Sequence, residues 1–483
     1  MSRTPYVAIN IPNHGGEQRL GCEQLVRHFH EEITSGRLRP GMRVPPVRSL
    51  EQRLGISKNT AQAAYDELAA RGLLESRARS GVFVAKQTDA LERGPLYAAS
   101  PALLHNAGVI PNPQVPQGRV RLDMVFIDPE LLPREQLSDC VRSVLANPGL
   151  KPFYDAQGHP GLRAQVAERL NQRGMDVDPE DVILTQGSQQ ALDMVARSLK
   201  HKVIATENPV YSFARLLFAN LGCQTVPLTL DPFKGIDLDE WEEVLRSHSP
   251  ALVYAIPNFQ NPTGYSYSTR ELEKLLELSE KLGFAILEDD WGSDMLSGTE
   301  YRPTLRALGG RNVLYVNSFT KKLLPSLRLG YIVASPETRG ALLAAKRLAT
   351  LGNSTLIEAT LAEFMDRGYY DTHLNRVHAE LDVRYKACIE RLAEVMPEGV
   401  RFSLPGGGPT LWLELPSAVD VRKLQERLQA RNVEIQLPYG HFYGRQHLNG
   451  FRVSYAFPTR AAIHDALGVV AEELRALLSD GHA

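Results

Sequence analysis

Residues 317–331 read NSFTKKLLPSLRLGY and follow directly on the apolar run VLYV at residues 313–316. A short apolar run that ends in a polar loop is typical of a buried strand. The loop carries two adjacent lysines, Lys321 and Lys322. Surface lysines are common, so the pair alone indicates no function. The stretch raises the question of whether one of the two lysines takes part in chemistry at a strand end.

Strand-like and helix-like patterns alternate on both sides of this stretch. The other apolar runs read DVILTQG (181–187), KVIATENP (202–209), ALVYAIP (251–257), FAILEDD (284–290) and LGYIVAS (329–335), with helical segments at residues 188–199, 210–222 and 269–283. Continuous apolar strands separated by helices predict a mostly parallel sheet with helices on both faces, which is the α/β class. Further on, TLWLEL (410–415), VEIQL (433–437) and FRVSYAF (451–457) predict companion strands of a small carboxy-terminal α+β subdomain.

Polar residues gather where four of the predicted strands end. They are Gly187, Ser188 and Gln189 after the run at 181–186, Asn261 in NFQNPTG after ALVYAIP, Asp289 and Asp290 after FAILE, and Ser318, Thr320 and the two lysines after VLYVN. Ligands of such sheets bind at the carboxyl ends of the strands. The sequence therefore predicts one shared binding site built from these ends.

The residue types at these strand ends fit a phosphorylated aldehyde cofactor such as pyridoxal 5'-phosphate. That cofactor needs a lysine for a Schiff base, a carboxylate at the pyridine nitrogen and donors for the phosphate. Asp289 or its neighbour supplies the carboxylate, which favours the pyridinium form of the ring. The phosphate donors would be Ser188, Ser318, Thr320 and Arg328, together with the backbone at the start of the helix after Gly187.

The segment SFTKKLLPSLRLGY resembles the pattern S-x-[ST]-K-x-x-x-P-x-x-R-x-G-Y of fold-type I aminotransferases, and the resemblance extends over about residues 123–478. It implies that Lys321 is the Schiff-base lysine and that Arg328 grips the phosphate. It also implies that Asn261 meets the phenolic oxygen of the cofactor, that Tyr211 stacks on the ring, that Tyr154 reaches the phosphate of a neighbouring subunit, and that Arg452 holds a substrate carboxylate. Packing roles for the two tyrosines and a structural ion pair for Arg452 stand as alternatives.

One residue departs from this family pattern. The aminotransferases carry a tyrosine shortly after the aspartate, whereas EDDWGSD places Trp291 there. An indole N–H donates a hydrogen bond but cannot exchange a proton as a phenol can, so turnover is expected to differ. Lys322 has no cofactor role in the resemblance and is expected to be a solvated neighbour.

A different module precedes this body. Leu25, Phe29 and Ile33 recur every fourth residue and predict an amphipathic helix that stops at Gly36. VRSLEQRLG (47–55) and ISKNTAQAAYDELAARG (56–72) predict two short helices joined by a tight turn, with Ser57 as the N-cap of the second. LLESRARSGVFVA (73–85) predicts a hairpin. This is the outline of a winged helix-turn-helix.

The second helix of that pair is the candidate DNA-reading element. Its apolar face consists of Ala61, Ala64, Tyr65 and Leu68, which leaves Lys58, Asn59 and Gln62 on the opposite face. Those three residues suit base edges, whereas Arg48, Thr60, Arg77 and Arg79 suit phosphates. An ordinary solvated helix face is the alternative for each residue taken singly.

Residues 24–85 resemble the winged helix-turn-helix of the GntR family. The shared residues are Gly36, Leu38, Pro40, Gly41, Pro45, Arg48, Leu50, Leu54, Gly55, Ser57, Thr60, Tyr65, Leu68, Gly72 and Gly81. The resemblance implies that Arg48 and residues 57–62 face double-stranded operator DNA.

Composition agrees with a basic module fused to an acidic body. Residues 17–86 hold 12 of the 54 basic residues and 8 of the 56 acidic ones, which leaves 42 basic and 48 acidic residues elsewhere. The amino terminus lacks a signal-peptide pattern, so a cytoplasmic protein is expected. The four cysteines have no ligand spacing, which argues against disulfides and predicts no metal site. The expected domains are residues 17–86, a proline-rich linker at 87–121, and residues 122–480 with the small subdomain from about 370.

A GntR-like module joined to an aminotransferase-like body is the architecture of the MocR-type transcription regulators. That resemblance implies a homodimer that uses pyridoxal 5'-phosphate and senses a small amino compound or the cofactor itself. The alternative is a working aminotransferase with an accessory DNA-binding module. A third possibility, a body that serves only as a dimerisation scaffold, is disfavoured because a scaffold needs no lysine, aspartate and arginine at strand ends. The sequence does not identify the effector, the operator or the sign of regulation.

Overall fold

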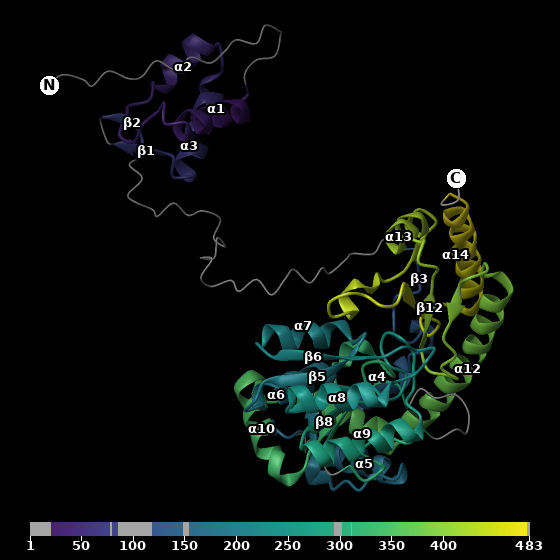
Figure 1. Ribbon diagram of the computed structural model, residues 1–483. Coiled ribbons are helices and arrows are strands. Elements are labelled where there is room, and N and C mark those ends of the chain that lie inside the picture. Colours follow the sequence, from purple (N-terminus) through teal and green to yellow (C-terminus); the bar gives the residue numbers. More distant parts are fainter. Residues whose placement is uncertain are drawn as a thin grey trace. The chain divides into compact units, whose positions relative to one another are not determined.

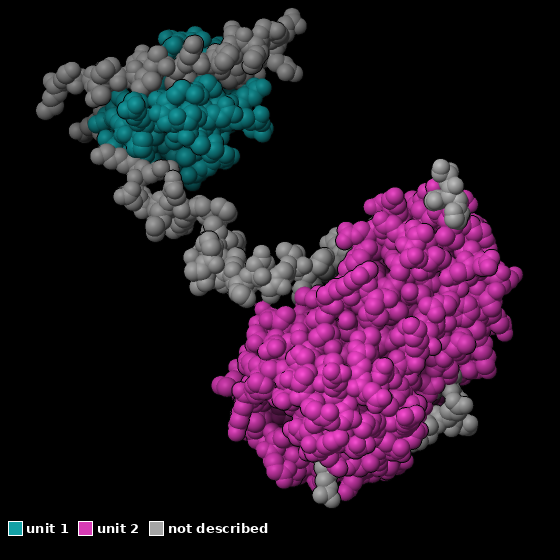
Figure 2. Space-filling view, in the orientation of Figure 1, with its two compact units in different colours: residues 1–106 teal, residues 107–483 magenta. Residues whose placement is uncertain are grey.

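A computed structural model describes residues 21–77, 80–85, 118–147, 154–293, 302–310 and 312–480. The chain divides into two compact units, residues 1–106 and residues 107–483 (Figure 2). Each unit has a hydrophobic core of its own.

The described part of the first unit contains three helices and a hairpin. They are α1 (Cys22–Thr34), α2 (Val47–Leu54), α3 (Lys58–Ala70), β1 (Leu74–Arg77) and β2 (Gly81–Val84), with β1 antiparallel to β2 (Figure 1). Gly55 ends α2 in the left-handed region at φ 63°, where a residue without Cβ is favoured. Ser57 then caps α3, because its side-chain oxygen accepts the Thr60 N–H at 3.0 Å. The predicted helix pair and wing are confirmed.

An aromatic contact centres the core of this unit. Phe29 of α1 and Tyr65 of α3 meet edge to face with ring centroids 5.4 Å apart. The Tyr65 hydroxyl donates to the Pro45 carbonyl at 2.7 Å, so the segment before α2 is tied to α3. The face of α3 that packs here is Ala61, Ala64, Tyr65 and Leu68, as its periodicity predicts. The opposite face of α3 is therefore left for another partner.

The second unit is built on a seven-stranded sheet with the order β4-β10-β9-β8-β7-β5-β6. Its strands are β4 (Val182–Thr185), β5 (Val203–Asn208), β6 (Gln224–Thr229), β7 (Leu252–Ala255), β8 (Ala285–Asp289), β9 (Val313–Ser318) and β10 (Gly330–Val333). Strand β10 runs antiparallel to both neighbours, and the other pairs are parallel. The expected mostly parallel sheet is confirmed. β6 carries buried and exposed residues in alternation and was not among the predicted strands.

Helices cover both faces of this sheet. They are α4 (Arg134–Ala146), α5 (Pro160–Gln172), α6 (Ser188–Ser198), α7 (Ser212–Asn220), α8 (Leu238–His248), α9 (Thr269–Leu282), α10 (Pro336–Thr350) and α11 (Thr355–Asp366), with short 3-10 turns η1 (Pro129–Leu131), η2 (Pro179–Asp181), η4 (Pro325–Leu327) and η5 (Pro438–His441). Successive strand residues face opposite helix layers. On β7, Leu252 and Tyr254 pack with α6 and α7, whereas Val253 packs with α8 and α9. Both faces are consequently buried.

A long helix, α12 (Tyr369–Val395), connects the sheet to a smaller subdomain (Figure 1). Val377 of α12 belongs to the core beside the sheet, and Cys388 belongs to the core of the subdomain. The subdomain contains α13 (Val421–Ala430), α14 (Arg460–Asp480) and an antiparallel sheet of β11 (Arg401–Phe402), β12 (Thr410–Glu414) and β14 (Gly450–Ser454). The predicted small α+β subdomain is present.

The VEIQL segment lies in this subdomain as expected, and it forms β13 (Val433–Glu434), which pairs in parallel with β3 (Val120–Arg121). One expectation about the linker was wrong. Residues 120 and 121 were expected in the linker, yet they form β3, and the next residue, Leu122, is fully buried in the subdomain core. The linker prediction failed at this end because a two-residue strand carries no periodicity.

None of the helices in the described ranges is long and apolar enough to cross a membrane.

Candidate cofactor site and DNA-reading helix

Lys321 lies in the turn that follows β9. Its amine sits 4.0 Å from the centre of the Phe126 ring. Burial, together with the nearby Arg452 and Arg328 cations, lowers the pKa of Lys321 to about 7, and the Asp289 charge opposes this shift. A lysine with that pKa is about half uncharged near pH 7, and the uncharged amine is the nucleophile that attacks an aldehyde.

Asp289 stands at the end of β8 and is 3% exposed. One carboxylate oxygen, Oδ2, accepts the Tyr254 hydroxyl at 2.8 Å, whereas Oδ1 is buried without a hydrogen-bond partner among the described residues. Burial raises the pKa of Asp289 to about 6 against the effect of that hydroxyl. An unpaired buried carboxylate oxygen is costly, so it indicates a missing donor. The ring N–H of a pyridinium is a donor of the right kind.

Three groups converge at the start of α6. Gly187 precedes the helix at φ 78°. A Cβ on Gly187 would lie 3.3 Å from Arg328 Nη2 and 3.6 Å from Thr320 Oγ1, so these atoms surround one small space. Thr320 Oγ1 is buried without a partner among the described residues. A helix N-terminus, a hydroxyl and a guanidinium form a cradle for a phosphate. We call these three residues the phosphate cradle.

The other predicted phosphate residues flank the phosphate cradle. Ser188 is the first residue of α6. Ser318 is partly engaged already, since its oxygen accepts the Thr320 N–H at 3.1 Å and donates to the Leu329 carbonyl at 3.4 Å. The Gln189 amide donates to the Phe213 carbonyl at 3.4 Å, and its Oε1 is buried without a partner in the described part of the chain.

Arg452 on β14 reaches this site from the small subdomain. Its guanidinium donates to Asn261 Oδ1 at 2.6 Å, to Gln436 Oε1 at 2.6 Å and to the Asp123 carbonyl at 2.7 Å. All three acceptors are neutral, and the described residues place no carboxylate in an ion pair with it. Burial lowers the pKa of Arg452 to about 10. A buried guanidinium whose bonded acceptors among the described residues are all neutral is suited to a ligand carboxylate. The structural ion pair considered as an alternative is therefore not observed within the described ranges.

Asn261 is held in place by this contact. Because an arginine only donates, the amide oxygen of Asn261 faces Arg452 and the amide nitrogen is left to donate elsewhere. The phenolic oxygen of the cofactor would accept from that nitrogen. One hydrogen bond thus connects the predicted cofactor contact with the predicted carboxylate contact.

The two tyrosines lie in different surroundings. Tyr211 precedes α7 and is partly buried against the core beside the sheet, and burial raises its pKa to about 12, with the Asp289 charge adding to the effect. Tyr154 is 56% exposed, and its ring packs on Gly352, where a Cβ would lie 2.7 Å from Tyr154 Cδ2. A large exposed ring on a rigid contact is compatible with a role at a subunit boundary.

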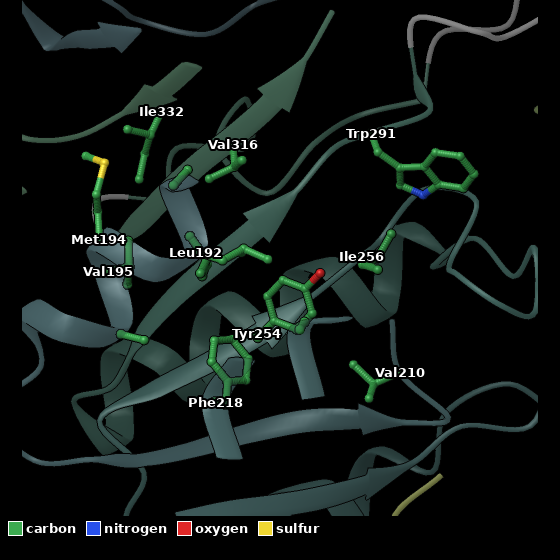
Figure 3. Close-up of a cluster of buried hydrophobic side chains, with 14 of the residues drawn as sticks. Leu192, Met194, Val195, Val210, Phe218, Tyr254, Ile256, Trp291, Val316 and Ile332 are labelled. Carbon is green, nitrogen blue, oxygen red and sulfur yellow. The ribbon is translucent and has the colours of Figure 1, made fainter. Parts of the chain in front are cut away.

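Trp291 stands where the family has a tyrosine. Its indole N–H donates to the Phe259 carbonyl at 3.0 Å, and the ring belongs to the buried cluster drawn in Figure 3. The N–H is thus already used within the protein. The expected effect of this residue on turnover stays a prediction.

Lys322 is different from the expectation. It is 1% exposed rather than solvated, and its amine donates to Asn317 Oδ1 at 2.5 Å. Charge alone suggested a surface position, but a polar side chain on β9 provides a partner inside the protein. Asp290 is likewise buried and accepts the Tyr315 hydroxyl at 2.5 Å. Of the two aspartates, Asp289 is therefore the one with an oxygen left for a ligand.

The described part of the first unit exposes the predicted DNA-reading face. Arg48, Ser57, Lys58, Asn59 and Gln62 are exposed, and Thr60 is half-buried. Gln62 donates to Asp66 Oδ1 at 2.8 Å. Arg77 donates to Glu75 at 2.9 Å and stacks on Phe83, so part of its hydrogen-bonding capacity is used. Arg79 lies outside the described residues.

Several residues of the site were missed by the sequence reasoning. Tyr254 bonds Asp289, Gln436 bonds Arg452, and Phe126 covers Lys321. A tyrosine inside the apolar run ALVYAIP was a usable signal, since a buried hydroxyl needs a partner. Phe126 and Gln436 stand in segments without a motif and could not have been found.

Comparisons with known proteins agree with this geometry. The family model for aminotransferase class I and II matches residues 127–470, and that for bacterial regulatory proteins of the gntR family matches residues 22–84. The HTH-type transcriptional regulator TauR of Rhodobacter capsulatus is 31% identical over 95% of this chain and 98% of its own length. The probable rhizopine catabolism regulatory protein MocR of Rhizobium meliloti is 29% identical over 95% of this chain and 94% of its own.

The crystal structure of LysN, an α-aminoadipate aminotransferase from Thermus thermophilus complexed with N-(5'-phosphopyridoxyl)-L-leucine, matches with a TM-score of 0.70. It is 31% identical and covers 75% of this chain and 94% of its own. The second unit is thus a fold-type I aminotransferase domain, and the first is a GntR-type helix-turn-helix. The chain belongs to the aminotransferase class I and II family, and within it to the MocR-type regulators. The aminotransferases of this family depend on pyridoxal 5'-phosphate, and the helix-turn-helix implies DNA binding.

The residues present fit that cofactor. The unpaired Asp289 Oδ1 suits the ring nitrogen, the phosphate cradle suits the phosphate, and the Lys321 amine suits the aldehyde. When bound, pyridoxal 5'-phosphate supplies an electron-withdrawing ring and a carbonyl that bonds covalently to amines.

Proposed function

We propose that this regulator senses a small amino compound that carries a carboxylate, through a cofactor site made of Lys321, Asp289, Asn261, Tyr211, Arg328, residues 187–189, Ser318 and Thr320. The observation that carries the proposal is a pair of buried polar atoms, Asp289 Oδ1 and Thr320 Oγ1, that have no hydrogen-bond partner among the described residues. Thr320 directly precedes Lys321, whose pKa is about 7, and the Asp289 charge acts on that lysine. A domain kept only as a scaffold would have little reason to retain these two buried polar atoms.

Arg452 supports the carboxylate in this proposal. It lies on β14 in the small subdomain, whereas Lys321 lies beside the large sheet. An effector amine competes with the Lys321 amine, and an effector carboxylate replaces neutral acceptors around Arg452. A ligand that engages both residues favours one arrangement of the two subdomains over another, which shifts the population of DNA-competent molecules.

The assembly and the DNA contacts belong to the same proposal. A homodimer would let Tyr154 of one subunit reach the phosphate of the other, and it would present two helix-turn-helix modules to double-stranded operator DNA. Lys58, Asn59 and Gln62 would read bases, while Arg48, Ser57, Thr60, Arg77 and Arg79 would contact phosphates. We place the DNA-binding module at residues 17–86 and the protein in the cytoplasm.

Aminotransferase activity is the second candidate function. The observation that favours it is the retention of Lys321, Asp289, Asn261 and Arg452 in one site together with the likeness to LysN. The residues support cofactor binding and capture of an amino acid in either case. The two functions differ in turnover, because an enzyme must also release its product at an ordinary rate.

The test uses full-length protein and a DNA fragment found by mapping its genomic binding sites. Lys321→Ala is expected to remove the visible absorbance of bound cofactor and the response of DNA binding to a panel of amino acids and amines. DNA binding itself should remain measurable, because the first unit has its own core. Lys346→Met is the matched control: it removes another buried lysine, whose amine donates to the Leu184 carbonyl at 2.6 Å, and it should keep the absorbance.

Two results would overturn the proposal. One is loss of the absorbance in Lys322→Met but not in Lys321→Ala. The other is sustained transamination of amino acids with keto acids at about 1 per second or faster, which would make the protein an enzyme first.

A further inference from the structure

Lys322, the residue after Lys321, begins a chain of buried hydrogen bonds. Its amine donates to Asn317 Oδ1 at 2.5 Å, and the Asn317 amide nitrogen donates to the Tyr315 oxygen at 3.0 Å. The Tyr315 hydroxyl donates in turn to Asp290 Oδ2 at 2.5 Å. None of the four residues is more than 1% exposed. We call Lys322, Asn317, Tyr315 and Asp290 the Lys322 network.

Each donor and acceptor in the Lys322 network is used in a consistent direction. A lysine only donates and a carboxylate only accepts, while the amide and the phenol do both. The chain therefore runs from a cation to an anion through two neutral groups. Because charges buried without a partner are costly, the two ends stabilise one another. The Lys322 network is thus a continuous path of hydrogen bonds between two buried charged residues.

The Lys322 network touches the turn that carries the predicted cofactor lysine. The Lys322 carbonyl accepts the His373 Nε2–H at 2.6 Å, so α12 holds the backbone one residue after Lys321. Asn317 Oδ1 also accepts the Ser318 N–H at 2.6 Å at the end of β9. The backbone is thus fixed on both sides of Lys321.

The far end of the Lys322 network lies next to the other predicted cofactor contact. Asp290 directly follows Asp289, and its charge is one of the causes that raise the pKa of Asp289. Ser293 bonds Asp290 through its N–H at 3.0 Å and through its hydroxyl, and the Arg173 guanidinium lies 4.0 Å away. The balance of charge around Asp290 therefore acts on Asp289.

We propose that Lys322 is a positioning residue for the cofactor site. Through the Lys322 network it fixes the turn that carries Lys321, and it balances the negative charge next to Asp289. This proposal rests on the proposed function, because it assumes that the cofactor occupies the site.

Other charged and titratable groups also surround Lys321 and the Lys322 network, and the test must leave them unchanged. Those facing Lys321 are Asp289 on β8, Arg452 on β14 and Arg328 after η4. Those facing the Lys322 network are Arg173 after α5, Glu288 on β8 and His373 on α12. A variant that changes only Lys322 or Tyr315 leaves all of these in place.

The experiment is a pH titration of the visible absorbance of full-length protein loaded with pyridoxal 5'-phosphate. Lys322→Met removes one positive charge at similar length, which favours the protonated form of groups nearby. The pH midpoint is expected to rise by about one unit. Tyr315→Phe keeps the volume and removes one donor to Asp290, so a smaller rise is expected.

Lys346→Met is the matched control. Lys346 is also fully buried, but its amine donates to the Leu184 carbonyl at 2.6 Å, away from the Lys322 network. The pH midpoint of the absorbance in Lys346→Met should equal that of the wild type. Tyr315→Phe keeps the test decisive if Lys322→Met does not fold.

The outcomes separate this inference from the proposed function. If the wild type shows no absorbance that depends on Lys321, the proposed function fails. If it does, and Lys322→Met and Tyr315→Phe keep the wild-type midpoint, the positioning role is overturned. If the pH midpoint rises in Lys322→Met but not in Tyr315→Phe, the effect comes from the turn, and the role of the Lys322 network is overturned. If the midpoint rises equally in Lys346→Met, the shift is a general effect of removing a buried lysine, and the positioning role is overturned.

Discussion

Two adjacent lysines face two adjacent aspartates in this protein, and the two sides differ in how their polar atoms are bonded. Around Lys321 and Asp289, the oxygens Asp289 Oδ1 and Thr320 Oγ1 lack partners among the described residues. Around Lys322 and Asp290, an unbroken chain of hydrogen bonds joins cation to anion. The same residue types therefore serve two purposes. Buried polar atoms left open indicate a ligand, and those that are paired indicate support.

Replacing Asp290 tests the supporting side and should have the largest effect. Asp290→Asn removes the negative end of the Lys322 network, which is the buried carboxylate that accepts the Tyr315 hydroxyl at 2.5 Å. We expect the free energy of unfolding of the cofactor-free protein to fall by about 3 kcal/mol. Denaturant unfolding measures it. Asp289→Asn is the control and should change the free energy by less than about 1 kcal/mol. If the free energy of unfolding falls equally in Asp290→Asn and Asp289→Asn, the two aspartates do not differ as the account claims.

Replacing Asp289 tests the open side. Asp289→Asn removes the charge that would pair with the ring nitrogen of the cofactor. Affinity for pyridoxal 5'-phosphate is expected to fall about 100-fold, as for loss of a charge-assisted hydrogen bond. Equilibrium dialysis of the apo protein with pyridoxal 5'-phosphate measures the change. Unaltered affinity in Asp289→Asn would mean that the unpaired oxygen serves no ligand.

The pH dependence of cofactor attachment sharpens the contrast between the lysines. The pKa of Lys321 is about 7, so the uncharged amine becomes the main form above that pH. The attachment rate should rise about tenfold between pH 6 and pH 8 and then level off, whereas an ordinary lysine would gain about 100-fold and continue to rise. Stopped-flow absorbance after mixing apo protein with pyridoxal 5'-phosphate records the rate. A rate still increasing at pH 9 would contradict the lowered pKa.

The smallest effect is expected in the first unit, where the exposed face of α3 is the predicted contact for DNA. Lys58→Ala should weaken binding to the mapped DNA fragment about fivefold at fixed salt. Arg27→Ala is the matched control, because it removes a positive charge from α1 where Arg27 pairs with Glu23 at 3.5 Å. Fluorescence anisotropy compares them. Equal weakening would indicate general electrostatics and not contact by α3.

Much of the fold was predictable because periodicity and capping are local. The apolar face of α3, its Ser57 cap and the strands that end at Asp289 and Ser318 all follow from short patterns. The pairing of the two-residue strands β3 and β13 could not be predicted in this way, because it joins segments about 300 residues apart. Pairing of that kind has no local signature.

The site was predictable in its motif residues but not in their partners. The motif assigns Lys321 and Arg328, and the strand end points to Asp289. The partners of Lys322 and Trp291 were missed because both depend on tertiary contacts, with Asn317 on β9 and with the Phe259 carbonyl. A charged residue in a loop is normally expected in solvent. Only the three-dimensional structure shows that Lys322 has a partner inside.

The most direct test of the central claim is to find which lysine holds the cofactor. Full-length protein loaded with pyridoxal 5'-phosphate would be reduced with borohydride, digested and mapped by mass spectrometry. The account predicts a pyridoxyl group on Lys321 and an unmodified Lys322. A pyridoxyl group on Lys322, or none on either lysine, would contradict it.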